Sequence, residues 1–150
     1  MATFLQRRRK NRRSSIRKLS ALLGGMNVVR AFLYANYSAV PQGVYHGRKV
    51  NGRFEVWVNG QLLPPYPDTP HASGYSWGYH GHSPPRLSQV LLYHCLGKKA
   101  AEDYDLVERF TEHTTVKLPR DSGWDLSQQE VCKIVGELLA QREKRDRIPR

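Results

Sequence analysis

The sequence predicts an α+β domain in which a small antiparallel β-meander packs against about three helices. Two Asn-Gly dipeptides separate short runs of alternating apolar residues in the first half of the chain, and three helix-like segments follow in the second half. Because the strands precede the helices, we expect the helices to cover one face of the sheet. We place this domain at residues 28–140, between a basic N-terminal arm at 1–27 and a basic C-terminal tail at 141–150.

Length and composition agree with one modest domain. The chain has 150 residues, of which 39% are hydrophobic, and this favours one domain over two. No run approaches the roughly 18 apolar residues that a membrane span needs. The two cysteines are too few for a disulfide-dense secreted scaffold. We therefore expect a soluble, cytoplasmic protein of a reducing compartment.

The hairpin is the clearest part of the predicted sheet. Residues 44–50 and 53–58 flank Asn51-Gly52, a dipeptide that tolerates positive φ at both central positions of a type I′ turn. A second Asn-Gly pair, at residues 59–60, follows the second strand and leads into a third strand. A cluster of prolines then ends the sheet, because proline has no N–H to donate to a neighbouring strand. The β-branched and aromatic segment 28–40 is expected to form a further strand.

The first helix is expected at residues 83–96. Ser83 is a suitable N-cap, and Pro84 then occupies the first helical position, where its missing N–H costs nothing. Apolar residues follow at steps of three and four, and Gly97 supplies a left-handed stop.

Two further helices are expected at residues 100–115 and 128–145. The first is acidic in its opening turn, as the helix dipole favours, and its buried side is marked by Tyr104, Val107 and Phe110. The second begins with a capping box between Ser127 and Glu130. Its apolar stripe contains Val131, Ile134, Val135, Leu138 and Leu139.

The charge is concentrated at the two ends of the chain. Residues 1–30 contain nine basic side chains and no acidic one, whereas residues 31–140 are close to neutral. Eight of the basic residues lie within the first eighteen positions: Arg7, Arg8, Arg9, Lys10, Arg12, Arg13, Arg17 and Lys18. We expect this arm to contact the phosphates of DNA or RNA, directly or within a nucleoprotein complex. A solubility tail and an organellar presequence are the alternatives.

A resemblance lies between the prolines and the first helix. The chain reads Trp-Gly-Tyr-His-Gly-His-Ser-Pro at 77–84, which resembles the Trp-Gly-Tyr-Gly-Gly-Ser-Gly-Pro signature of a family of small bacterial, plasmid and phage domains designated domain of unknown function 6166. The matching positions are Trp77, Gly78, Tyr79, Gly81, Pro84 and Leu87. Hairpin motifs at 45–47 and 56–60, and a Leu-Pro and Trp-x-Leu segment at 118–126, are also similar to the family, so the resemblance spans roughly residues 44–135.

The chain departs from the signature where His80, His82, Ser83 and Arg86 replace a glycine, a serine, a glycine and a glutamine. The resemblance implies an α+β fold and a phage or mobile-element setting, and it assigns no mechanism. Two interpretations of the loop remain open. Its backbone N–H groups lead into a helix N-terminus and could bind an anion, or Trp77 and Tyr79 could cap the core while the glycines allow close packing.

No complete catalytic motif is present. His80, His82, His94 and Cys95 are the only cluster of metal-ligand types, and no second pair completes a tetrahedral set. Asp103, Asp105 and Glu108 lie close together in the sequence, but a solvated helix start explains them. We therefore expect a noncatalytic protein with neither a cofactor nor a metal ion.

Three functions follow from these observations. The first is an accessory protein that binds nucleic acid or joins a nucleoprotein complex through its basic arm. The second is an adaptor or inhibitor that acts on a host defence enzyme, with the 75–86 loop as the surface for its protein partner. The third is a small enzyme that uses His80 and His82. We expect the first, because the basic residues are segregated from the acidic ones.

Overall fold

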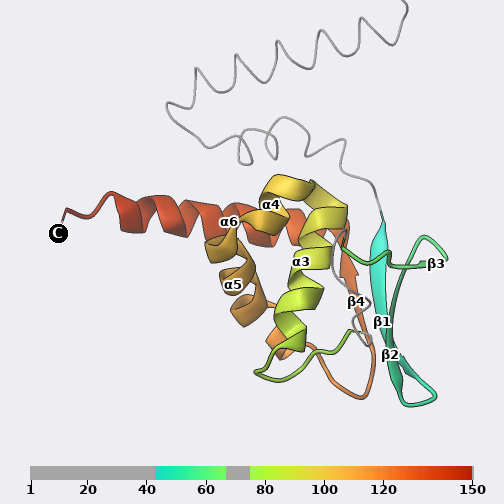
Figure 1. Ribbon diagram of the computed structural model, residues 1–150. Helices are drawn as coiled ribbons and strands as arrows, with labels where there is room; N and C mark the ends of the chain where they lie inside the picture. Colours follow the sequence, from blue (N-terminus) through green and yellow to red (C-terminus); the bar gives the residue numbers. More distant parts are fainter. Residues whose placement is uncertain (1–42, 67–74, 150) are drawn as a thin grey trace, which may run out of the picture. The chain divides into compact units, whose positions relative to one another are not determined.

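The computed structural model describes residues 43–66 and 75–149 (Figure 1). A four-stranded antiparallel sheet in the order β3-β2-β1-β4 packs against helices that lie on one of its faces. The elements are β1 (Val44–Val50), β2 (Arg53–Val58), β3 (Gln61–Leu62), α3 (Ser83–Leu96), α4 (Lys98–Glu102), α5 (Tyr104–His113), the short 3₁₀ helix η2 (Thr115–Lys117), β4 (Trp124–Ser127) and α6 (Gln128–Asp146). The predicted α+β class is confirmed. The strand expected at 28–40 lies outside the described residues, as does the basic arm.

The meander forms as the two Asn-Gly dipeptides predict. Asn51 and Gly52 have φ angles of 50° and 78°, and Asn59 and Gly60 have φ angles of 51° and 75°. Positive φ at both central positions is the geometry of a type I′ turn, whose twist matches that of the flanking strands.

The fourth strand is an addition to the predicted sheet. β4 pairs with the outer edge of β1, so that Leu126 lies opposite Tyr45 and Trp124 lies opposite Gly47. The Trp124 ring lies over the backbone of Gly47, where an added Cβ would clash with the ring. This strand has only four residues, and its pairing partner lies about eighty positions earlier, so local pattern does not reveal it.

Helix α3 has the predicted bounds, but its cap is different. The N-cap is His82, whose side chain makes no capping hydrogen bond, and Ser83 is already helical. Pro84 therefore occupies the second helical position, which is tolerated because its missing N–H is also one of the unpaired donors of a helix start.

The single helix expected at 100–115 is wrong, because Asp103 divides it into α4 and α5. Asp103 has extended backbone angles, and its side chain accepts a hydrogen bond of 3.1 Å from the backbone N–H of Leu106. Because α5 begins anew at Asp103, the residues that face the core differ from those predicted. Leu106 and Phe110 are buried, whereas Tyr104 is 80% exposed. The predicted burial of Tyr104 is therefore wrong, and Val107 is only half-buried.

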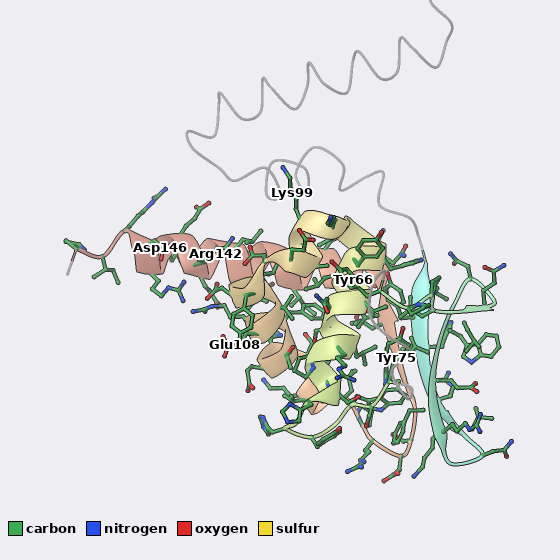
Figure 2. All side chains as sticks on the ribbon, viewed as in Figure 1. Tyr66, Tyr75, Lys99, Glu108, Arg142 and Asp146 are labelled. Atoms are coloured by element: carbon green, nitrogen blue, oxygen red, sulfur yellow. The ribbon has the colours of Figure 1, made fainter. Side chains whose placement is uncertain are left out.

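Helix α6 begins with the predicted capping box. The Ser127 hydroxyl accepts from the Glu130 N–H at 3.0 Å, and the Glu130 carboxylate accepts from the Ser127 N–H at 2.7 Å. Of the predicted stripe, all but Ile134 are buried. Arg142, which the charge pattern assigns to the basic tail, lies on this helix and binds both oxygens of Asp103 at 3.0 and 2.9 Å (Figure 2).

Trp77 lies at the centre of the core and is fully buried. Its ring meets Phe54 of β2 and Trp124 of β4 edge to face, with centroid separations of 4.8 and 5.3 Å. Its indole N–H donates to the carbonyl of Pro119 at 3.0 Å. One side chain therefore joins the loop before α3, two strands and the segment before β4. No described helix is both long and apolar enough to cross a membrane.

We predict that Trp77→Ala lowers the free energy of unfolding by about 3–5 kcal/mol, because it leaves a cavity between the sheet and the 115–119 segment. Urea unfolding measures the change. Trp57→Ala is the matched control, since Trp57 lies half-buried on the opposite face of β2 and its removal opens no internal cavity. Equal losses for the two variants would contradict the central position of Trp77.

Candidate functional site

The loop at residues 75–82 consists of a buried anchor and an exposed rim. Trp77 and Gly78 form the anchor. The Gly78 N–H donates to the carbonyl of Thr115 at 3.0 Å, which ties the loop to η2. Gly78 has a φ of 78°, and a Cβ at this position would lie 2.6 Å from the carbonyl oxygen of Leu118. Only glycine combines this backbone angle with so close an approach. The anchor therefore serves packing.

The exposed rim carries His80, His82 and Arg86 beside the half-buried Tyr79. Tyr79 is half-buried, and the Arg120 guanidinium lies 5.1 Å from its ring centroid. His80 has a 76% exposed side chain, and its Nδ1 lies 3.6 Å from a carboxylate oxygen of Glu112. His82 and Arg86 are exposed at the start of α3. The rim can present cations and imidazoles to an anionic ligand or to a protein surface.

The four residues of metal-ligand type do not form one site. His80 and His82 lie before the first turn of α3, whereas His94 and Cys95 lie in its last turn. With a rise of about 1.5 Å per residue, twelve residues of helix separate the two pairs by about 18 Å. Among residues 43–66 and 75–149, no group of three His, Cys, Asp or Glu side chains is placed to hold a metal ion.

The acidic residues of α5 are bound to arginines. Asp105 contacts Arg109 at 3.2 Å and Arg145 at 3.5 Å, and Asp103 is held by Arg142. Burial alone would raise the pKa of Asp105, but the hydrogen bond from Arg109 and the nearby arginine charges lower it below the usual value. These carboxylates pair α5 with α6 rather than forming an open magnesium site.

An open hollow between α5 and α6 shows no preference for charge. Its lining contains Asp105, Glu108, Arg109, Glu112, His113, Lys117, Leu138 and Arg145. Three carboxylates and three cations balance one another there, so the hollow attracts neither anions nor cations by net charge.

The uncovered face of the sheet carries an ion-pair group. His46 Nδ1 and Arg48 Nη2 lie 2.7 and 3.2 Å from the same oxygen of Asp125. The hydrogen bond from His46, together with Arg48, lowers the pKa of Asp125. Both partners project from β1 toward β4, so this group supports the pairing of the two strands.

A polar cluster of the buried Tyr45 and Gln128 and the more exposed His94 joins three elements that are distant in the sequence. The Tyr45 hydroxyl lies 2.8 Å from Nδ1 of His94, and the Gln128 side-chain amide donates to the same hydroxyl at 3.1 Å. Gln128 also binds both backbone groups of Gly43, at 2.9 and 3.3 Å. Burial raises the pKa of Tyr45 and lowers that of His94, which favours a neutral imidazole that accepts a hydrogen bond from the Tyr45 hydroxyl.

Sequence reasoning missed this cluster because Gln128 reads only as part of a capping box. A second missed group is the thiol pair of Cys95 and Cys132, whose sulfurs lie 3.8 Å apart. Cys95 and His94 are neighbours in the chain but face different partners, as their 100° separation around the helix requires.

The eight basic residues of the arm, Arg7 to Lys18, lie outside the described residues. Comparison with known families finds one match: the profile described as "Family of unknown function (DUF6166)" covers residues 45–137. The matched range contains the sheet, the loop, α3 to α5 and most of α6. No curated protein and no solved structure matches the chain significantly.

The lowered pKa of His94 predicts that the stability of the fold depends on pH. Its pKa is lower in the folded protein than the unfolded value of about 6.5. Its contribution to stability is therefore present above that value and is lost as the pH falls through the folded pKa. We expect the free energy of unfolding to fall between pH 7.5 and 5.5 more steeply for the parent protein than for His94→Asn, whose amide oxygen can accept from Tyr45 without titrating. Parallel pH profiles would contradict this role.

Proposed function

The chain belongs to the Family of unknown function (DUF6166), and we propose that it is a noncatalytic nucleic-acid-binding protein, or an accessory protein of a nucleoprotein complex. In this proposal the basic residues at 7–18 of the arm contact phosphates. The proposed setting is a phage or another mobile element, in the cytoplasm of its bacterial host. Family membership supports the fold, so the functional proposal rests on this chain's own charges.

The observation that carries the proposal is the segregation of charge. The arm holds eight basic residues within eighteen positions, and the first carboxylate in the chain is Glu55. An uncompensated run of this kind attracts polyanions, and each phosphate that it neutralises releases counterions. Five of the eight are consecutive or nearly so, at Arg7 to Arg12, which suits a backbone that carries a charge at every nucleotide.

The body supports the same assignment, because many of its own charges are used internally. Arg109, Arg142 and Arg145 are paired with carboxylates between or within α5 and α6. In the described part of the chain, Arg86 and Lys117 have no ion-pair partner, and both lie close to the exposed rim. We propose them as secondary phosphate contacts. The wide separation of the two histidine pairs along α3 supports the noncatalytic part of the proposal.

The exposed rim favours a second candidate, a protein adaptor or an inhibitor of a host defence enzyme. His80, His82 and Arg86 are all exposed, and the anchor holds the loop in a fixed conformation, which suits a docking surface. This function would use the body alone and would not need the arm.

We predict that the full chain binds both DNA and RNA with a log–log salt slope near −4 if about five arm residues contact phosphates, about −4.5 for a duplex and about −3.5 for a single strand. Replacing Arg7, Arg8, Arg9, Arg12 and Arg13 together by Ala should remove most of this slope and weaken binding equally for different sequences. Fluorescence anisotropy at several salt concentrations measures both quantities.

The matched control removes the same charge from positions outside the arm, three in the body and two in the C-terminal tail. It replaces five exposed residues by Ala: Arg53, Lys99, Lys133, Lys144 and Arg147. The control should keep the parental slope. If the arm variant keeps the parental affinity and slope instead, the arm does not bind nucleic acid and the proposal is wrong. Capture of a protein partner that survives the arm substitutions and is lost with His80→Ala and Arg86→Ala would favour the adaptor.

A further inference from the structure

The two cysteines of the chain lie against each other in the folded body. Cys95 is in the last turn of α3 and Cys132 is in the second turn of α6, and both thiols are free. Their sulfurs are 3.8 Å apart. We propose that Cys95 and Cys132 form a reversible dithiol–disulfide site, which hydrogen peroxide oxidises and a small thiol such as glutathione reduces. This proposal does not depend on nucleic-acid binding.

The geometry suits a bond between the two sulfurs. A disulfide has an S–S distance of about 2.05 Å, so the sulfurs need to approach by about 1.8 Å. Rotation about the two Cα–Cβ bonds changes the distance between the sulfurs without moving the backbone. The bond would link α3 to α6 across 37 positions of the sequence, and these helices already pack against each other.

The surroundings distinguish the two thiols. The Cys95 thiol donates to the carbonyl oxygen of Gln128 at 3.6 Å, and its sulfur lies 3.8 Å from that of Cys132, where either thiol can be the donor. The hydrogen bond between the thiols, together with burial, raises the pKa of Cys95, and the same bond lowers the pKa of Cys132. The first proton to leave the pair therefore leaves a thiolate on Cys132, stabilised by the Cys95 S–H.

Access to the pair favours a small oxidant. Cys132 is only 2% exposed, whereas Cys95 is partly exposed and opens the pair to solvent. Hydrogen peroxide is close to water in size and carries no charge, so it can enter where a bulky reagent cannot. The pair is therefore expected to react with peroxide in preference to large aromatic disulfides.

The reaction balances with one peroxide for each pair of thiols. The thiolate attacks one peroxide oxygen, the O–O bond breaks, and the departing hydroxide takes a proton to leave as water. The resulting sulfenic acid is attacked by the second sulfur, which forms the S–S bond and releases a second water molecule. Two thiols are oxidised and one peroxide is reduced. Reduction by two glutathione molecules returns both thiols and yields glutathione disulfide.

The experiment treats the full chain with hydrogen peroxide, alkylates the remaining thiols in denaturant, and analyses the monomer by mass spectrometry. We expect a monomer that has lost two hydrogen atoms, takes up no alkylating reagent, and yields a peptide pair joined through Cys95 and Cys132. Glutathione should restore two alkylation sites. Because the chain contains only two cysteines, an internal disulfide can only be this pair.

Two variants test whether proximity in the fold is responsible. Cys95→Ser leaves Cys132, the expected thiolate, and should yield a sulfenic acid on Cys132, which dimedone traps in denaturant, without an internal bond. The double variant Cys132→Ala with Lys133→Cys keeps two thiols but moves the second by about 100° around α6, to an exposed position, and should form no internal disulfide. The proposal is overturned if peroxide leaves both parental thiols free, if it produces sulfinic or sulfonic acids without the cross-link, or if the displaced pair forms the bond equally well.

Discussion

The packing of Trp77 between Phe54 and Trp124 is the contact on which the rest of the fold depends. It brings together strands β2 and β4 and the loop before α3, and its indole N–H is bound by Pro119. Two glycines make the arrangement possible. Gly47 leaves room on β1 for the Trp124 ring, and Gly78 lets the loop backbone approach the 115–118 segment. Trp77 and Trp124 are buried and Phe54 is half-buried beside them, and large aromatic rings supply much of the apolar contact of a small domain.

This packing shows what Trp77 and Gly78 do in the loop. They serve the core, so their presence alone does not indicate a binding site. The exposed part of the loop lies outside this anchor and contains His80, His82 and Arg86. A fixed anchor lets exposed loop residues contact a partner without a change in the fold.

Many charged side chains of the helices are paired with one another. The carboxylates of α5 bind arginines of α6 across the helical layer, and Asp103 both begins α5 and binds Arg142. Residues 31–140 are close to neutral, and the largest excess of cations lies in the arm. At the C-terminal end of α3, the Gln128 side chain binds the backbone of Gly43 and the hydroxyl of Tyr45, which contacts His94. The thiol of Cys95 donates to the Gln128 carbonyl nearby. The helical layer is thus joined to the sheet by polar contacts as well as by the core.

The sequence by itself determined the features that depend on neighbouring residues. Both type I′ turns, the bounds of α3 and the capping box at Ser127 follow from local backbone preference and local hydrogen bonds, as does the α+β class. Of the candidate site, the sequence identified the signature loop and the charge of the arm. The tertiary structure alone decided the β4 pairing, the outward position of Tyr104, the Tyr45–His94–Gln128 cluster and the Cys95–Cys132 contact. The strand pairing and the two side-chain contacts join residues that lie 34 to 83 positions apart. The position of Tyr104 depends on where the cap at Asp103 begins α5. No local sequence pattern contains this information.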